Sequence, residues 1–113
     1  MAENKLADMS TEFAVKVLNL TDGIKGHYSL ANQLERSGTS IGANIREAFY
    51  AHGKADFIAK LQIALKECSE TEYWIELILE SGYYHDKTLL DKCTEIKRIL
   101  IASLNTAKEK NNG

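Results

Sequence analysis

Apolar and small residues recur along the chain in alternating steps of four and three positions. The clearest run lies mid-chain and passes through Leu34, Gly38, Ile41, Ile45, Ala48 and His52. A second run with the same spacing follows at Phe57, Leu61, Ala64, Cys68, Thr71, Ile75 and Ile78. This spacing places residues on one side of an α-helix, as in helices that pack side by side. The central stretch therefore predicts two long amphipathic helices that are joined at Gly53.

The same spacing predicts one further helix on each side of this pair. Their apolar seams are Leu6, Met9, Phe13, Val17, Leu20 and Ile24 in the first, and Leu89, Cys93, Ile96, Leu100, Ser103 and Ala107 in the last. Val15 and Leu18 lie beside the first seam and widen its apolar face, so we expect that helix to have neighbours on two sides. The four predicted helices span about residues 3–24, 29–52, 55–81 and 87–108. Gly82 and Asp86 are the turn signals between the last two.

Composition agrees with an all-α chain. The 113 residues include no proline and only 7 glycines, which favours long uninterrupted helices over a sheet with many turns. Four amphipathic helices with short connections predict an antiparallel up-down-up-down four-helix bundle. We expect residues 1–113 to form this bundle as a single domain, without a disulfide or a metal to hold it.

One stretch of the second helix is unusual in its composition. Residues 37–42 read Ser-Gly-Thr-Ser-Ile-Gly, which are mostly poor helix formers. Either the helix breaks here, or the small residues allow another backbone to come close. The apolar seam keeps its phase through the stretch, which favours a continuous helix. Gly38 and Gly42 lie one turn apart and would form a notch for a neighbouring helix.

A ridge of polar residues follows the same helix. Ser37, Ser40, Asn44 and Glu47 are spaced by three, four and three positions and so share one side. One hypothesis is a buried hydrogen-bonded set that fixes this helix to a neighbour, within one chain or between chains. The other hypothesis is a binding site for a ligand or a second subunit.

The third helix offers two more candidates for structural or subunit contacts. Glu72 interrupts an apolar column formed by Ile58, Leu65 and Leu79, at a position where an apolar side chain is expected. A buried carboxylate needs a partner, and we expect Arg36 or Arg46 from the second helix. Trp74 flanks the seam, where an exposed aromatic side chain would be typical of a subunit interface.

The sequence carries no catalytic or metal-binding pattern that we can identify. It has no Glu-x-x-His pair of the kind that holds metals in ferritin-like bundles, no phosphate-binding glycine loop and no nucleophile elbow. Cys68 and Cys93 both fall on apolar seams, so we expect them to be buried thiols. The alternative is a disulfide between two helices. We therefore expect a protein that is not an enzyme and uses no cofactor.

The formal net charge of −2 gives no general support to a protein that binds polyanions. The candidate nucleic-acid contacts are the cations around the second and third helices, namely Arg36, Arg46, Lys54 and Lys60. A ring-shaped oligomer would repeat such a patch, and avidity would then strengthen weak binding. The chain starts without a basic-then-apolar run and has no apolar run of about 20 residues, so we expect a cytoplasmic protein without a membrane partner.

Two stretches of the chain resemble a known family. They are Gln33 to Ser37 and Ser40 to Ala48, which contain the pattern Ser-Ile-x-x-Asn-Ile-x-Glu. This pattern is similar to the signature of small bacterial four-helix bundles encoded, among other places, in intervening sequences of 23S ribosomal RNA genes. Phe57 to Ala64 and Glu67 to Trp74 also resemble that family's third helix. The family usually has glycine where this chain has Ala48.

The resemblance implies more than the fold. Members of that family form homopentamers, and they are often labelled ribosomal proteins because of the location of their genes. A similar pentameric bundle of diversity-generating retroelements binds nucleic acid and a reverse transcriptase, but it is strongly basic, unlike this chain. Our first hypothesis is accordingly an oligomeric scaffold. It rests on Gly38, Gly42, Asn44 and Trp74, which would lie off or beside the seam that packs within the chain. The alternative is an accessory protein that binds RNA or DNA, or a nucleic-acid-processing protein.

Overall fold

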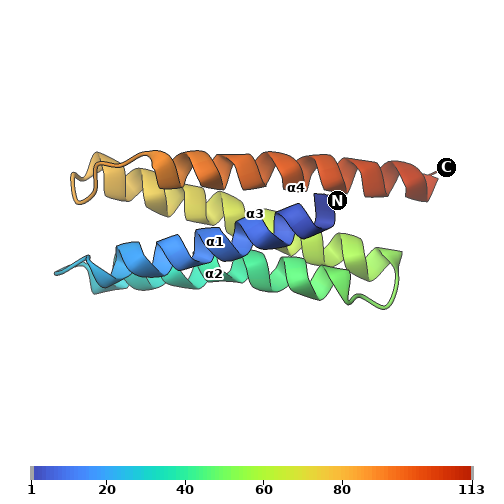
Figure 1. Ribbon diagram of the computed structural model, residues 1–113, viewed down its shortest axis with the longest axis horizontal. Coiled ribbons are helices and arrows are strands. Elements are labelled where there is room, and N and C mark those ends of the chain that lie inside the picture. Colours follow the sequence, from blue (N-terminus) through green and yellow to red (C-terminus); the bar gives the residue numbers. More distant parts are fainter. Residues whose placement is uncertain (1, 113) are drawn as a thin grey trace.

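The computed structural model describes residues 2–112, with side chains between Lys5 and Glu109. It contains four α-helices in the order α1 (Ala2–Asp22), α2 (Tyr28–Phe49), α3 (Lys54–Glu80) and α4 (Thr88–Asn112). Successive helices run in opposite directions and form an elongated bundle of 50 × 21 × 20 Å (Figure 1). The all-α, up-down-up-down bundle predicted from the hydrophobic spacing is therefore confirmed.

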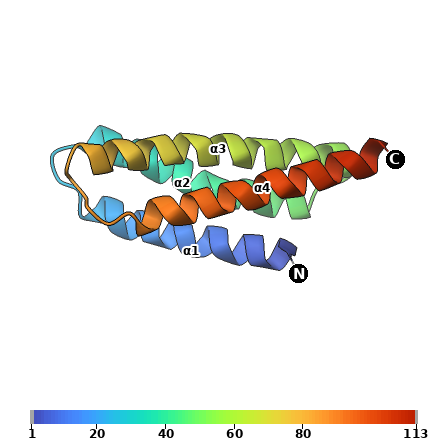
Figure 2. The same cartoon turned by 90° about the horizontal axis from the view of Figure 1, so that it is seen from above.

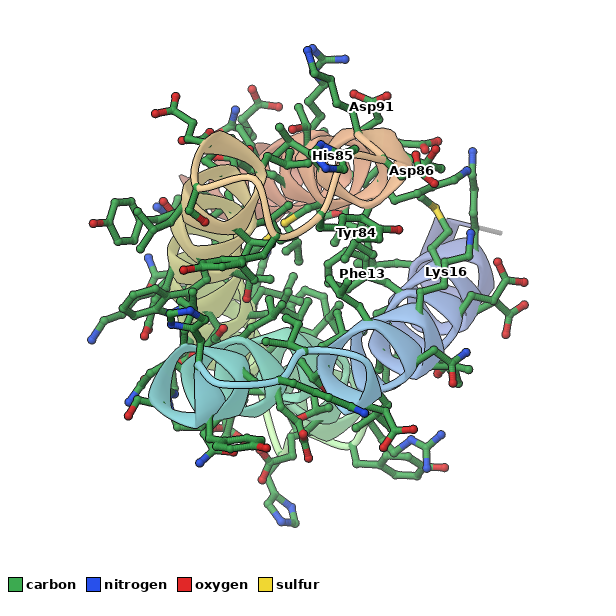
Figure 3. All side chains as sticks on the ribbon, turned by 90° about the vertical axis from the view of Figure 1, so that its left-hand side faces the viewer. Phe13, Lys16, Tyr84, His85, Asp86 and Asp91 are labelled. Atoms are coloured by element: carbon green, nitrogen blue, oxygen red, sulfur yellow. The ribbon has the colours of Figure 1, made fainter. Side chains whose placement is uncertain are left out.

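The four helices surround one core, with each helix beside its neighbour in the sequence. Viewed from one end, α1, α2, α3 and α4 enclose the space that the apolar side chains fill, and Phe13 and Tyr84 point into it (Figure 3). α2 packs against both α1 and α3, whereas α1 and α4 are less closely packed against each other. Towards its carboxyl end α4 extends beyond the start of α1 (Figures 1 and 2).

The core consists of the predicted seams. The largest fully buried side chains include Phe13 and Val17 of α1, Leu34, Ile41 and Ile45 of α2, Leu61, Ile75 and Ile78 of α3, and Ile96 and Leu100 of α4. Burial of one such side chain contributes about 1.5–3 kcal/mol relative to leaving it in water. The four-three spacing keeps these residues on one side of each helix over its whole length. The apolar core thus accounts for the side of each helix that faces inward.

The connection between α3 and α4 has the predicted end signals. Gly82 adopts a positive φ of 82°, which a residue without a side chain adopts at no steric cost. Its N–H donates to the carbonyl of Leu79 (3.2 Å), and the N–H of Tyr83 donates to the carbonyl of Ile78 (3.3 Å). This pair of hydrogen bonds is the Schellman motif that ends many helices. Asp86 accepts a hydrogen bond from the N–H of Thr88 (2.9 Å) and so caps α4.

The two loops at this end of the bundle lie against each other. The rings of His27 and Tyr83 have centroids 4.1 Å apart, which joins the α1–α2 connection to the α3–α4 connection. Gly26 has a positive φ of 88° in the first of these loops. The sequence predicts turns at both places but does not show that they meet.

Three details of the prediction are wrong. α2 ends at Phe49 rather than near His52, because Tyr50 and Ala51 donate to carbonyls three residues back and so tighten the last turn. His52 is therefore exposed and not part of the α2 seam. Val15 and Leu18 are about half-exposed, so no neighbour within the described chain covers the wider face of α1. α4 continues to Asn112, since no helix breaker precedes it.

Candidate interface surfaces

The glycine notch of α2 receives α1 of the same chain. α2 is continuous through Gly38 and Gly42, as the unbroken seam predicts. A Cβ atom at Gly38 would lie 3.0–3.1 Å from the two γ-methyl groups of Val17, and one at Gly42 would lie 3.3 Å from Oγ of Ser10. The notch therefore serves helix packing within the chain, at least along its α1 side. Its tighter point is Gly38, which has two methyl groups of a buried valine against it.

The polar ridge of α2 bonds to its own helix and not to a neighbour. The hydroxyl of Ser37 donates to the carbonyl of Leu34 (3.4 Å) and that of Ser40 to the carbonyl of Arg36 (2.6 Å). The side-chain amide of Asn44 donates to the carbonyl of Ser40 (2.9 Å). Glu47 is exposed. The predicted hydrogen-bonded network to another helix of the same chain is thus wrong, while a contact between chains stays a prediction. Within the chain, these short hydroxyl and amide side chains donate to backbone carbonyls of the preceding turn.

Arg36 joins α2 to α3 through an ion-pair cluster. Its guanidinium donates to Glu67 (3.2 Å) and to Glu70, and the indole N–H of Trp74 donates to the same carboxylate of Glu70 (3.2 Å). The hydrogen bond from Arg36 lowers the pKa of Glu70, and Trp74 and Lys66 act in the same direction. Bonding to Glu70 also raises the pKa of Arg36. Trp74 is half-buried here and packs on the core, so the candidate interface tryptophan also has an intrachain role.

Glu72 is paired, but with α4 instead of α2. Its carboxylate accepts hydrogen bonds from Nζ of Lys97 (2.9 Å) and from the hydroxyl of Thr94 (3.0 Å). The expected partners Arg36 and Arg46 are therefore wrong. The reason is the side of α3 on which Glu72 lies: Cys68, one turn earlier, contacts α4. The bond to Glu72 raises the pKa of Lys97.

Cys68 and Cys93 are free thiols that face one another across α3 and α4. Their sulfur atoms are 3.7 Å apart, and each thiol donates to the backbone carbonyl of the other residue at 3.4 Å. The hydrogen bond from Cys68 and burial raise the pKa of Cys93. The structure thus shows the buried-thiol alternative rather than the disulfide.

A long shallow groove runs along the outer side of the α1–α2 pair. It has a volume of about 1180 Å³ and small or apolar walls, with Ala7, Thr11 and Ala14 from α1 and Gly42 and Ala43 from α2. Arg46, Glu47, Phe49 and Tyr50 line the rest of it. On α1 the exposed Leu18 continues the line of Ala7, Thr11 and Ala14 by helical spacing, with Val15 beside it. We call this surface the α1–α2 groove. Tyr50, at 79% exposure, stands at one end of it.

A second apolar surface lies on α3. Ile63, Tyr73 and Leu77 are exposed on the same outer side of the helix. Tyr73 and Leu77 are one turn apart, whereas Lys66 and Glu70 lie between them and Ile63. The rings of Tyr73 and Trp74 are adjacent, with centroids 5.1 Å apart. We call these three residues the α3 ridge. The sequence pattern pointed to the tryptophan but not to the ridge, because Ile63 and Leu77 alternate with charged residues.

Comparison with known proteins identifies the fold family. The family model described as 23S rRNA-intervening sequence protein matches residues 2–102. The chain belongs to the 23S rRNA-intervening sequence protein family. The resemblance drawn from the Ser40 to Ala48 motif is therefore confirmed.

A crystal structure shares the family fold throughout. It is that of a protein of unknown function from the S23 ribosomal protein family of Bacteroides thetaiotaomicron VPI-5482. The two chains are 44% identical, and the match covers 93% of this chain and 99% of the other, with a TM-score of 0.87. No curated protein matches the sequence. Family membership thus establishes the bundle, while the role of the protein has to be inferred from its own surfaces.

The candidate nucleic-acid contacts of this 23S rRNA-intervening sequence family member lie in different surroundings. Arg36 is bound by two carboxylates, Arg46 lines the α1–α2 groove beside Glu47, and Lys54 lines a cavity near the α2–α3 turn. Lys60 is half-buried on α3. Arg36 is thus neutralised by carboxylates of α3, whereas Arg46 and Lys54 both lie close to Phe49 at the end of α2.

The described residues contain no cluster of three or more histidine, cysteine, aspartate or glutamate side chains that would hold a metal ion. No helix within the part of the chain that the structure describes has both the length and the apolar character of a membrane span. The α1–α2 groove and the α3 ridge are accordingly the surfaces of this family member that a functional account has to explain.

Proposed function

We propose that the protein is a non-enzymatic scaffold that assembles from several copies of this chain. The observation that carries the proposal is the pair of unlike apolar surfaces on one bundle, the hollow α1–α2 groove and the projecting α3 ridge. Large apolar side chains gathered at a surface are typical of interaction sites. Their exposed fractions, 50% for Val15 and 55% for Tyr73, leave these side chains open to a partner.

The shapes of the two surfaces favour a ring. A contact between two different surfaces repeats from subunit to subunit and closes into a ring when the rotation allows it. Small side chains at Ala14, Gly42 and Ala43 leave room for the isoleucine, tyrosine and leucine of the α3 ridge of a neighbouring copy. We propose a pentamer, the assembly that the family resemblance implies.

The environment of the cysteines supports a reducing compartment such as the cytoplasm as the place of action. Cys68 and Cys93 are close enough to interact, yet they are present as free thiols. Disulfides are rare in the cytosol, where thiols are kept reduced. A bundle in such a compartment has to be held by core packing, and the buried apolar side chains of this chain form such a core.

Substitution of Ala43 by arginine tests the scaffold proposal. Ala43 is exposed on α2 and lines the groove, so Ala43→Arg leaves the core unchanged and places a charge where the α3 ridge would dock. We expect at least a tenfold weaker assembly by sedimentation velocity, since a buried unpaired charge is costly at an interface.

The matched control is Asn105→Arg, an exposed position on α4 that lies in neither surface. It should assemble like the unaltered protein, and circular dichroism should show the same helix content for both variants. Unchanged assembly of Ala43→Arg would remove the groove as an interface.

Purification without nuclease addresses the alternative of nucleic-acid binding. The proposed scaffold should elute without nucleic acid. Binding of RNA or DNA that weakens with added salt would instead support an accessory protein with phosphate contacts.

A further inference from the structure

A separate cavity opens at the end of the bundle that holds the α2–α3 turn. Its volume is about 470 Å³, and all four helices contribute to its walls, with Leu6 from α1, Phe49 from α2, Phe57 and Leu61 from α3, and Ile99 and Ala102 from α4. Here α4 extends beyond the start of α1 (Figures 1 and 2). A cavity of this size lies in the range of small-molecule sites.

The polar groups of the cavity are few. Among the side chains that the structure describes, Lys54 is the one charged residue in its wall, and Ser103 and Thr106 add hydroxyl groups on α4. Between Lys5 and Glu109 no carboxylate lines it, and none of the ion pairs among these side chains includes Lys54. A single cation beside apolar walls is complementary to a ligand with one negative charge and an apolar tail.

We propose that this cavity binds a medium-chain fatty acid. The unbranched tail lies among Phe57, Leu61 and Ile99, and the carboxylate accepts hydrogen bonds from Lys54. The ammonium group of lysine is a compact charge on a flexible stem, which suits a small anionic head group at an open rim. None of the α3 ridge residues lines the cavity, and of the residues that line the α1–α2 groove only Phe49 also lines it.

Isothermal titration with a series of saturated fatty acids, below the concentrations at which they form micelles, provides the first test. We expect one site per chain. Affinity should rise about fourfold for each methylene that enters the cavity, and it should level off once the cavity is full. An absence of saturable binding by decanoate would overturn the proposal, as would an affinity that rises without levelling off.

Two variants separate the roles of tail and head group. Ala102→Trp fills the cavity from an exposed position of its wall and should weaken decanoate and decanol at least tenfold alike. Lys54→Met should weaken decanoate at least tenfold and leave decanol unchanged. Asn105→Trp, on the same helix but outside the cavity, and Lys87→Met, at the other end of the bundle, are the controls and should bind like the unaltered chain.

The results with these variants show whether a fatty acid or a second copy of the chain occupies the cavity. Unchanged decanoate binding by Ala102→Trp would place the fatty acid elsewhere and refute the site. An equal loss of decanoate and decanol in Lys54→Met would refute the carboxylate contact. A change of oligomer mass in Ala102→Trp without any fatty acid binding would assign the cavity to a second copy of the chain and overturn the proposal.

Discussion

At the scale of single residues, Cys68 and Cys93 show how position in a helix pair sets side-chain chemistry. Both side chains are fully buried, and each sulfur atom has only the other cysteine as a hydrogen-bond partner. Burial and this contact raise the pKa of Cys93, so the neutral thiol is the stable form. The thiolate is the reactive form of cysteine, and the folded protein therefore suppresses it.

Alkylation by iodoacetamide tests this account. In the folded protein we expect both cysteines to react at least about a hundredfold more slowly than in urea, because reaction requires opening of the bundle. The rate should stay low at about pH 8.5, where an ordinary thiol is half ionised. Peptide mass spectrometry would locate the modified residue. Equal rates in folded and unfolded protein would show that the thiols are accessible.

The contribution of the Arg36 cluster to the stability of the fold depends on pH, and the direction of this dependence follows from the pKa of Glu70. The pKa of Glu70 is lower in the folded chain than its ordinary value, chiefly because of Arg36. The stabilisation by the Arg36–Glu70 pair is therefore fully present above the pKa of a glutamate in the unfolded chain, which is about 4.3. This stabilisation is lost as the pH falls through the lower pKa that Glu70 has in the folded chain.

Arg36→Gln should lower the urea midpoint at neutral pH. The difference from the unaltered protein should shrink as the pH falls below about 4. Arg98→Gln is the control, since Arg98 is exposed and takes part in none of the described ion pairs. A difference that stays constant between pH 7 and pH 3 would contradict an ionic role for Arg36.

At the scale of helices, the hydrophobic spacing was sufficient to predict the architecture. Burial of one side of each helix contributes most to the stability of a bundle, and a four-three repeat such as Leu34, Gly38, Ile41 and Ile45 marks that side directly. The same reasoning correctly kept α2 continuous through Gly38 and Gly42. A broken helix would have shifted the seam to another side of α2.

The partners of polar side chains could not be predicted in this way. Glu72 pairs with Lys97 because side chains lean towards the start of their own helix. In the antiparallel pair α3 and α4, the two side chains therefore lean towards each other across about two turns. This requires the register of α3 against α4, which the contact of Cys68 with Cys93 reveals only in the structure. The groove and the end cavity likewise depend on how the helices diverge.

The packing of α1 on α2 gives a prediction at this scale. Gly38→Ala should destabilise the protein by about 1 kcal/mol, because the clash with Val17 exceeds the gain in helix propensity. Gly42→Ala should be close to neutral, since the gain in helix propensity opposes a milder approach of 3.3 Å to Oγ of Ser10, which donates to the carbonyl of Ala7. Chemical denaturation of the two variants provides the comparison.

A second substitution isolates the clash. In a Val17→Ala background, Gly38→Ala should lose its destabilising effect, because the two methyl groups that it meets are gone. Val17→Ala alone costs stability by leaving a cavity, so only the coupling energy between the two substitutions is informative. A coupling energy near zero would mean that the notch does not set the distance between α1 and α2.

At the scale of the whole molecule, large apolar side chains remain exposed on the outer sides of α1 and α3. The core closes within the chain, yet Val15, Leu18, Ile63, Tyr73 and Leu77 remain exposed in two separate places. Association between copies would bury both surfaces at once. The central claim is therefore self-assembly, and it follows from the outer sides of α1, α2 and α3, not from the core.

Native mass spectrometry of protein purified without nuclease tests that claim most directly, since it reads the number of subunits and any bound ligand together. We expect a pentamer with the mass of five chains and no nucleic acid. A pentamer that carries added nucleic-acid mass would support the accessory-protein alternative. A monomer at micromolar concentration would contradict the scaffold proposal.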